Sequence, residues 1–234
     1  MISVIIRTKN EAIWLERCLR AVRLQSLTID AVILVDNDSV DGTPDIARAY
    51  DCTVLSISDR EFTYGRALNY GIAHTKSEFI AILSAHCIPV NDSWLHRLWL
   101  NFQDNSISGV YGRQEPLPDS HDFDKRDLWT AFGLDRRVQQ VGYFFHNANS
   151  MIRRGVWEYF RFDETLSGVE DRAWAKKVLA AGYRIVYEPT ASVYHHHGIH
   201  QGRDETRAAR VVKVIELLNQ NQQPIGKEAQ KEAR

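Results

Sequence analysis

Two carboxylates and three imidazoles lie close together late in this chain of 234 residues. Glu170 and Asp171 open a segment with helical spacing, and His195, His196 and His197 end the strand-like segment that follows it. Acidic residues in the first turn of a helix usually only complement the helix dipole. Carboxylates and imidazoles are also, however, side chains that move protons or hold metal ions. One pocket shared by these side chains would therefore favour a catalytic site.

Composition limits the class of protein. With 44% hydrophobic residues the chain can bury a full core, and its length suits one large α/β domain or a domain with a small appendage. The net charge of −1 argues against a nucleic-acid partner. The widely spaced Cys18, Cys52 and Cys87 favour reduced, buried thiols in a cytosolic protein over a disulfide framework or a zinc site. No apolar run reaches the roughly 18 residues of a membrane-spanning helix, so we expect a soluble, unprocessed protein.

Strand and helix patterns alternate along the first half of the chain. Apolar runs predict strands at residues 4–7, 31–35, 54–57, 79–84 and 107–113. Helical periodicity predicts helices at 11–24, from 44 onward, at 65–74 and at 94–102. This alternation is typical of βαβ units, so the expected fold class is α/β, with a mostly parallel sheet flanked by helices.

The second half is less regular. Residues 115–141 are rich in proline, aspartate and other charged residues, which favours an insertion or a mobile helical segment over sheet. Residues 172–181 have helical periodicity and end at Gly182, which suits a left-handed helix cap. Short strands are expected at 183–187 and 191–194. After Arg203 we expect a mildly amphipathic helix and a frayed tail.

The loops after parallel strands are where an open α/β sheet binds ligands. Here they hold the polar runs Arg7-Thr8-Lys9-Asn10, Asp36-Asn37-Asp38-Ser39 and Ser84-Ala85-His86-Cys87. Neither GxGxxG nor GxxxxGK[ST] occurs in the sequence, so a dinucleotide fold and a P-loop are unsupported. A nucleotide would have to be held by side chains and a metal ion. An Asx-turn explains Asp38 and Ser39 well, but it does not explain why a buried strand ends in the acidic Asp36.

Three segments resemble the landmarks of glycosyltransferase family 2, namely Val4 to Ala12, Val35 to Thr43 and Gly168 to Asp171. Four further segments are similar to the bacterial rhamnosyltransferase branch of that family, at residues 79–89, 109–114, 147–154 and 173–197. The likeness covers roughly residues 1 to 200 in motif order, and several motifs together are far more specific than any one of them.

The resemblance implies a GT-A fold, which is a Rossmann-like sheet flanked by helices with a small acceptor-side segment. Residues 1–202 would form one domain, with a nucleotide-binding half at 1–113 and an acceptor half at 114–202, followed by a helix and tail at 203–234. The implied reaction moves a sugar from a nucleotide-sugar donor to a glycan or lipid-linked acceptor, with inversion in a single displacement. Bacterial surface polysaccharide synthesis at the cytoplasmic face of the membrane would be its setting, and membrane contact through the C-terminal helix is a hypothesis.

The resemblance also implies roles for individual residues. Asp171 matches the general base of the family and Glu170 its orienting neighbour. Thr8, Asp36 and Asn37 match positions that hold the nucleobase and ribose. The remaining nucleotide-sugar contacts would come from Arg7, Asn10, Ser84, Ala85 and His86 in the loops, and from Arg66 and Asn69 at a helix start. Arg7 and Lys9 could neutralise the diphosphate, although a surface ion pair would look the same in sequence.

One departure concerns the metal site. Where the family places a DxD motif this chain has Ser84-Ala85-His86, which leaves a role for Mn²⁺ or Mg²⁺ in doubt. His86 could ligate a metal with His195 or His197, or contact the diphosphate directly, or be a loop histidine without a ligand. His195 matches the family histidine that completes the metal or phosphate site, whereas strand alternation points His196 away from it. His197 and His200 could touch phosphate or lie on the surface.

Two other functions would use the same fold. A donor carrying a nucleoside monophosphate would depend less on a DxD motif. A nucleotide-sugar-binding module that has lost catalysis would also explain the missing motif, but the presence of Glu170 and Asp171 argues against it.

Overall fold

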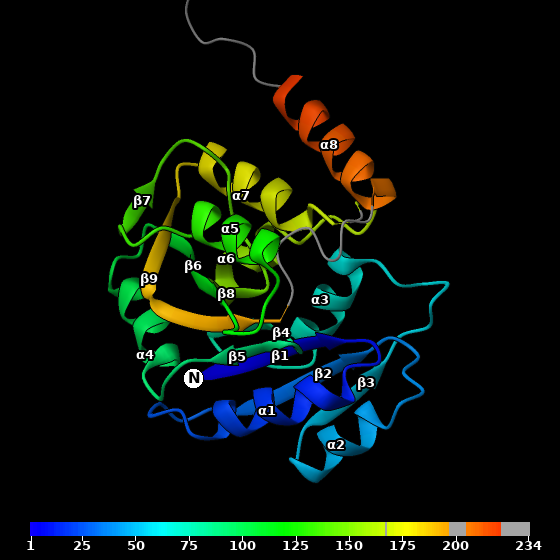
Figure 1. The fold of residues 1–234 in the computed structure, drawn as a ribbon. Coiled ribbons are helices and arrows are strands. Elements are labelled where there is room, and N and C mark those ends of the chain that lie inside the picture. The colour runs from blue at the N-terminus through cyan, green and yellow to red at the C-terminus, as the bar shows by residue number, and fades with distance from the viewer. Residues whose placement is uncertain (167, 197–204, 221–234) are drawn as a thin grey trace, which may run out of the picture.

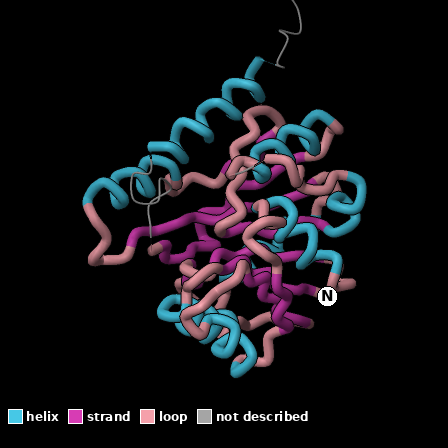
Figure 2. The backbone as a smooth tube through the Cα atoms, turned by 90° about the vertical axis from the view of Figure 1, so that its right-hand side faces the viewer, coloured by secondary structure: helices cyan, strands magenta, loops and turns pink. Residues whose placement is uncertain are grey.

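The computed structural model describes residues 1–166, 168–196 and 205–220. Its centre is a sheet of nine strands in the order β3-β2-β1-β4-β8-β6-β9-β5, with β7 paired to β9. The pairings show that β1, β2, β3, β4, β6 and β9 run in one direction, while β5, β7 and β8 run in the other. The sheet is therefore mostly parallel, as the sequence predicts, and it runs through the middle of the molecule with helices around it (Figures 1 and 2).

The first half of the chain forms the regular βαβ part of the sheet. Its elements are β1 (Ile2–Thr8), α1 (Ala12–Arg23), β2 (Ala31–Asp36), α2 (Thr43–Ala49), β3 (Thr53–Ser56), α3 (Tyr64–Ala73) and β4 (Phe79–Ser84). All seven strands and helices predicted for this part are confirmed.

The second half adds the remaining strands and the helices that cover them. Its elements are β5 (Cys87–Pro89), α4 (Trp94–Trp99) with a 3-10 turn at Leu100–Gln103, β6 (Ile107–Pro116), α5 (Asp122–Ala131), β7 (Arg137–Gln139), β8 (Asn149–Arg153), α6 (Arg154–Tyr159), α7 (Glu170–Ala180), β9 (Arg184–His195) and α8 (Glu205–Gln220).

Alternation along β1 divides the core between the two faces of the sheet. Val4 and Ile6 belong to a cluster that includes buried residues of α1 and α4. Ile5 belongs to the other cluster, which includes buried residues of α3, α6 and α7. Successive strand residues point to opposite faces, so an unbroken apolar strand requires helices on both sides. This requirement positions α7, which begins with Glu170 and Asp171, over the sheet.

The prediction for residues 115–141 was wrong in part. The segment contains the expected helix, α5, but β6 extends to Pro116 and β7 pairs with β9. The two short strands expected around Pro189 are one strand, β9. A register shift opposite Gly112–Gln114 accommodates the proline, since proline is tolerated at irregular places in a sheet. Sequence periodicity does not report such long-range pairing.

The helix α8 confirms the helix expected after Arg203 and lies at the outside of the molecule, at the upper right of Figure 1. Its Val211 side chain lies beside Gly168, and the Lys176 ammonium of α7 donates a hydrogen bond to the Leu218 carbonyl. In the part of the chain that the structure describes, no helix is long and apolar enough to cross a bilayer.

Asn149 of β8 provides a test of how α4, β6 and β9 are held together in the second half of the chain. Its Nδ2 donates to the carbonyls of Arg113 (2.9 Å) and Ala191 (2.9 Å), and its Oδ1 accepts from Trp94 Nε1 at 2.8 Å. We expect Asn149→Ala to lower the free energy of unfolding by about 3 kcal/mol, because buried donors and acceptors lose their partners. Asn105→Ala, at an exposed turn, is the matched control. Equal denaturation midpoints in urea for both variants would contradict this role.

Candidate active site

The carboxyl ends of β1, β4 and β9 meet at one edge of the sheet, where a cavity of about 360 Å³ opens. We call it the central cavity. The antiparallel β8 brings its amino end, with His146 and Ala148 just before it, to the same edge. The wall is formed by Arg7, Thr8, Lys9, Glu11, Asn37, Phe62, Tyr64, Ser84, His86, His146, Ala148, Gly168, Glu170, Asp171 and His195. The structure thus brings the carboxylates and His195 into one site, as the sequence predicts for a shared pocket.

Glu170 and Asp171 occupy the first turn of α7, facing the cavity. Burial raises the pKa of Glu170, and the neighbouring Asp171 charge adds to this rise. Burial also raises the pKa of Asp171, although backbone N–H groups offset part of the effect. Asp171 Oδ2 accepts from the Asn147 N–H at 3.2 Å, and Oδ1 accepts from the Arg172 N–H at 2.7 Å. Two buried carboxyls with raised pKa values are typical of groups that exchange protons.

Arg7 is the cation next to this pair. Its Nη1 lies 3.8 Å from Glu170 Oε1, and its guanidinium carbon lies 4.7 Å from the centre of the Tyr64 ring. The Arg7 charge lowers the pKa of Glu170 and so opposes the effect of burial. Nε and Nη1 of Arg7 are buried and make no hydrogen bond within the described residues. These donors could therefore serve an anionic ligand.

His86 and His195 meet across the site. Their rings stack at 5.0 Å between centres, tilted by 13°, and His86 Nδ1 is 2.7 Å from Glu11 Oε1. Ligand atoms of His86, Cys87 and His195 lie within 4.8 Å of one another. Burial raises the pKa of the Cys87 thiol well above its usual range, so this sulfur is held as a thiol.

The donor chemistry of this cluster decides which metal it fits. Mg²⁺ sites consist of oxygen ligands in a near-octahedral arrangement, whereas imidazole suits first-row transition metals. Two imidazoles with one carboxylate beside them therefore suit a transition metal better than Mg²⁺. His86 and His195, which the sequence offered as metal ligands, lie close enough together to share a divalent ion.

The residues expected to hold the nucleobase and ribose lie at the ends of β1 and β2. Thr8 Oγ1, Asp36 Oδ1 and Asn37 Oδ1 are buried and have no hydrogen-bond partner in the described residues. Asp36 Oδ2 accepts from the Ser39 N–H at 3.1 Å, so the Asx-turn exists but uses only one oxygen. Unsatisfied buried oxygens require an explanation, and a bound nucleotide would provide one.

Other predicted contacts do not reach the central cavity. Asn10 has a positive φ of 53°, and its Oδ1 accepts from the Val40 N–H at 2.8 Å, which holds two loops together. Ala85 is buried in the core, while its neighbour Ser84 lines the cavity. Lys9, in contrast, lies on the wall of the central cavity, and it pairs with Asp59, which is the surface ion pair that the sequence left open.

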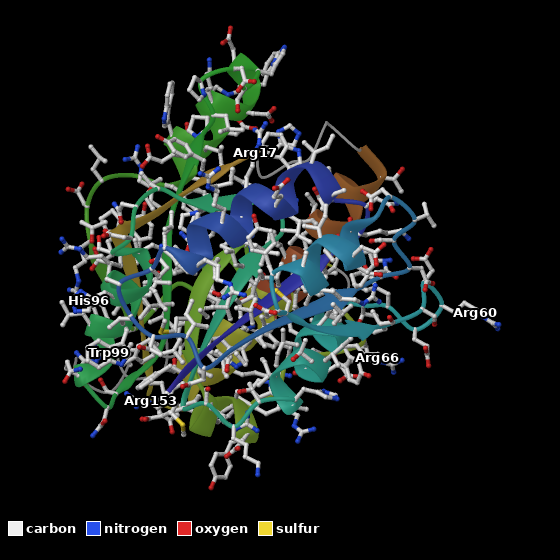
Figure 3. All side chains as sticks on the ribbon, turned by 90° about the horizontal axis from the view of Figure 1, so that it is seen from below. Arg17, Arg60, Arg66, His96, Trp99 and Arg153 are labelled. Carbon is white, nitrogen blue, oxygen red and sulfur yellow. The ribbon has the colours of Figure 1, made fainter. Side chains whose placement is uncertain are left out.

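Arg66 and Asn69 also lie outside the central cavity, on the wall of another one. Arg66 of α3, labelled in Figure 3, pairs with Glu164 at 3.0 Å. Asn69 donates to the Phe162 carbonyl and accepts from Trp157 Nε1, both at 2.9 Å. Their expected role in donor binding is therefore corrected to a structural one. Helical periodicity identified the helix but not which of its side chains face the ligand.

His196 turns away from the cluster. Its ring stacks on Trp14 of α1 at 3.9 Å between ring centres, which agrees with the expected turn away from His195. His197 and His200 lie outside the described residues.

Sequence reasoning missed three contributors, namely Glu11, Tyr64 and His146. Glu11 and Tyr64 lie at the starts of helices, close in sequence to the predicted contacts Asn10 and Arg66. This closeness in sequence could have identified them. His146 directly precedes the Asn147 motif, but only the antiparallel direction of β8 explains its place at this edge.

The fold and this site define a class of enzyme, the GT-A sugar transferases, in which a mostly parallel sheet holds the donor at its carboxyl edge. The chain belongs to glycosyl transferase family 2, whose family model matches residues 3–160. Both the family and the rhamnosyltransferase-like branch expected from the motifs are thereby confirmed, the branch through the named relatives that follow.

The chain is 29% identical to the O-antigen chain rhamnosyltransferase WbaN of Salmonella anatum, over 71% of this chain and 56% of that protein. It is 26% identical to the O-antigen chain rhamnosyltransferase RfbN of Salmonella typhimurium, over 84% of this chain and 66% of that protein. Glycosyltransferase AglE of Haloferax volcanii is 30% identical over 80% of this chain and 64% of its own length. The chain thus spans between about half and two thirds of the length of these curated relatives.

Solved structures show the same fold. The mannosyltransferase PcManGT from Pyrobaculum calidifontis, in complex with GDP-Man and Mn²⁺, superposes with a TM-score of 0.66 at 23% identity, covering 83% of this chain and 56% of that one. S. aureus TarS 1–349 in complex with UDP-GlcNAc superposes with a TM-score of 0.66 at 17% identity. The match covers 83% of this chain and 58% of that one.

The Arg7–Glu170 pair makes a prediction about protonation. Replacing Arg7 by Gln removes the charge that favours the carboxylate form, so the pKa of Glu170 should rise further, by about one unit. Carboxyl ¹³C chemical shifts followed against pH would measure this. Arg66→Gln, which removes a guanidinium from another carboxylate, is the control and should leave the Glu170 titration unchanged. An unaltered Glu170 curve in the Arg7 variant would show that the pair is not electrostatically coupled.

Proposed function

We propose that this chain is an inverting glycosyltransferase that moves a sugar from a nucleotide-sugar donor to a hydroxyl of a glycan or lipid-linked acceptor. Its setting would be the synthesis of a bacterial surface polysaccharide. The observation that carries the proposal is the Glu170–Asp171 pair, in which Glu170 is buried and Asp171 half-buried, and which faces the cavity at the carboxyl edge of the sheet. The names of the Salmonella relatives support a deoxyhexose such as rhamnose as the sugar.

The reaction follows from where the charges lie. The acceptor hydroxyl gives its proton to the Asp171 carboxylate while its oxygen attacks the anomeric carbon. The bond from that carbon to the donor phosphate breaks, and the nucleoside diphosphate leaves with the electron pair. Attack and departure occur on opposite faces of the sugar, so the anomeric configuration inverts. Glu170, held by Arg7, fixes the orientation of the turn that carries Asp171.

The leaving diphosphate needs positive charge. Arg7 presents buried donors to the cavity, and His86 and His195 stand at the end of β4 and β9. A transition-metal ion held by His86 and His195 would add a Lewis acid there. Thr8 and Asn37 supply the polar groups that fit the nucleoside.

Asp171→Asn tests the base. We expect the rate of sugar transfer to fall by roughly a thousandfold, because general-base catalysis contributes about 10² to 10⁴, while nucleotide affinity stays within twofold. Asp45→Asn, at an exposed ion pair on α2, is the matched control. Transfer that survives in the Asp171 variant would refute its role, and no transfer by either the wild type or the control would favour the binding-module function.

Nucleotide binding tests the histidine cluster. UDP, dTDP, GDP and CMP would be titrated into the protein by calorimetry, with Mn²⁺, with Mg²⁺ and with EDTA. We expect one nucleoside diphosphate to bind about tenfold more weakly after His86→Ala, and EDTA to weaken the wild type similarly, because the cluster fits a transition metal.

The control for this titration is His96→Ala, on α4 at the outer edge of the molecule (Figure 3). Binding that ignores EDTA but needs His86 would mean that the histidine contacts the diphosphate itself. Unchanged binding in the His86 variant would make it a loop histidine without a ligand. A preference for CMP would indicate a nucleoside monophosphate sugar as the donor.

A further inference from the structure

Two more cavities extend from the central one along the acceptor half of the chain. The first, of about 330 Å³, lies between α8 and the start of α7, and we call it the helix cavity. It shares His146, Gly168 and Asp171 with the central cavity. Asp171 therefore forms part of the wall between the two. A molecule in the helix cavity would reach this carboxylate from the side opposite to a donor in the central cavity.

The second, of about 610 Å³, continues from the helix cavity, with which it shares Phe144 and Arg172. We call it the arginine cavity because Arg137 lies on its wall as well. We call these two adjacent cavities together the trough. Arg172 lies on the wall of both, and Arg137 lies on the wall of the arginine cavity.

These two guanidinium groups are placed alike. The Arg172 carbon lies 5.0 Å from the centre of the Phe144 ring, and the Arg137 carbon lies 4.9 Å from that of Tyr187. Neither forms an ion pair within 4.0 Å with a carboxylate of the described residues, in contrast to the adjacent Arg136, which pairs with Glu188 at 3.3 Å. Stacking on a ring fixes the plane of a guanidinium and leaves its in-plane N–H groups to form hydrogen bonds. Arg137 uses part of this capacity on the Tyr111 hydroxyl, and its other N–H groups can bind a ligand.

The surroundings of Arg137 strengthen this point. Tyr111, at the base of the cavity, has its pKa raised to about 12 by burial, and the Arg137 guanidinium offsets part of that rise. The Arg172 charge lowers the pKa of the neighbouring Asp171, so Arg172 acts on that carboxylate as well as on the cavity. The chain as a whole carries a net charge of −1. The local positive charge is therefore not a consequence of composition.

We propose that the acceptor is an anion, and that Arg137 and Arg172 bind its phosphate or carboxylate group in this trough while its hydroxyl reaches Asp171 through the helix cavity. This inference rests on the proposed function, because it assigns the second substrate of that reaction. Val211, Val212 and Ile215 of α8 form the outer wall of the helix cavity, so α8 becomes part of the acceptor site.

The test uses charged probes and their neutral counterparts. Farnesyl diphosphate with farnesol, and glucuronic acid with glucose, would be titrated into the full chain while the preferred nucleotide saturates the central cavity. We expect at least one anionic probe to bind and its neutral counterpart not to bind. Binding of farnesyl diphosphate would indicate that the anion is an isoprenoid phosphate. Binding of glucuronic acid would indicate that it is an acidic sugar.

Variants then assign the binding. Arg137→Gln and Arg172→Gln should each lower the affinity for the anionic probe roughly tenfold, as expected for the loss of one charge-assisted contact. Arg137→Lys should recover part of the lost affinity. Arg136→Gln is the matched control and should bind like the wild type. Binding of neither anion, equal binding of the neutral probes, or equal affinity in the glutamine variants would each overturn the proposal.

Titration of nucleotides into the same proteins distinguishes a failure of the anionic-acceptor proposal from a failure of the proposed function. Nucleotide binding that persists without any anion binding would overturn the anionic acceptor alone. Loss of nucleotide binding in the wild type would overturn the proposed function, and the anion titration would still decide whether the trough binds anions.

Discussion

The placing of two adjacent carboxylates at the edge of the core is the constraint on which the rest of this structure depends. Glu170 is buried and Asp171 half-buried, and both their burial and their like charges disfavour ionisation. The compensation comes from three directions in the chain. Arg7 reaches Glu170 from β1, the Asn147 N–H reaches Asp171 from the loop before β8, and the helix supplies the Arg172 N–H. The pair can be held only if β1, β8 and α7 converge on one edge of the sheet.

The same convergence explains why the site has two sides. Asp171 stands where the cavity over β1 and β4 meets the cavity under α8. A group that takes a proton from one substrate and faces the reacting carbon of another must touch both spaces. A wall formed by one carboxylate satisfies this requirement without any movement of the sheet. The positive groups are correspondingly divided, with Arg7 on one side and Arg172 on the other.

The regular part of the fold could be predicted from the sequence because local patterns determine it. Apolar runs located β1 to β4, and the rule that parallel strands end at one edge brought the loops at residues 7–10 and 84–87 together. The resemblance to the family added Asp171 and His195 to this site. The rest depended on pairing between distant segments. No local signal shows that β8 runs antiparallel between β4 and β6, and its direction places His146 in the site. Likewise, helical spacing alone cannot show that Asn69 turns toward Trp157 instead of a ligand.

The contrast between β9 and α8 has a consequence for motion. β9 pairs with β6, β5 and β7, so His195 stands on a strand whose amides can exchange with solvent only through a large opening. α8 is attached by side-chain contacts such as Lys176 to Leu218 and Tyr143 to Asn219, without any pairing to the sheet. Local opening of α8 therefore costs far less than opening of the sheet. The wall of the central cavity at His195 therefore resists opening, whereas local opening of α8 would widen the helix cavity from the side without any change in the sheet.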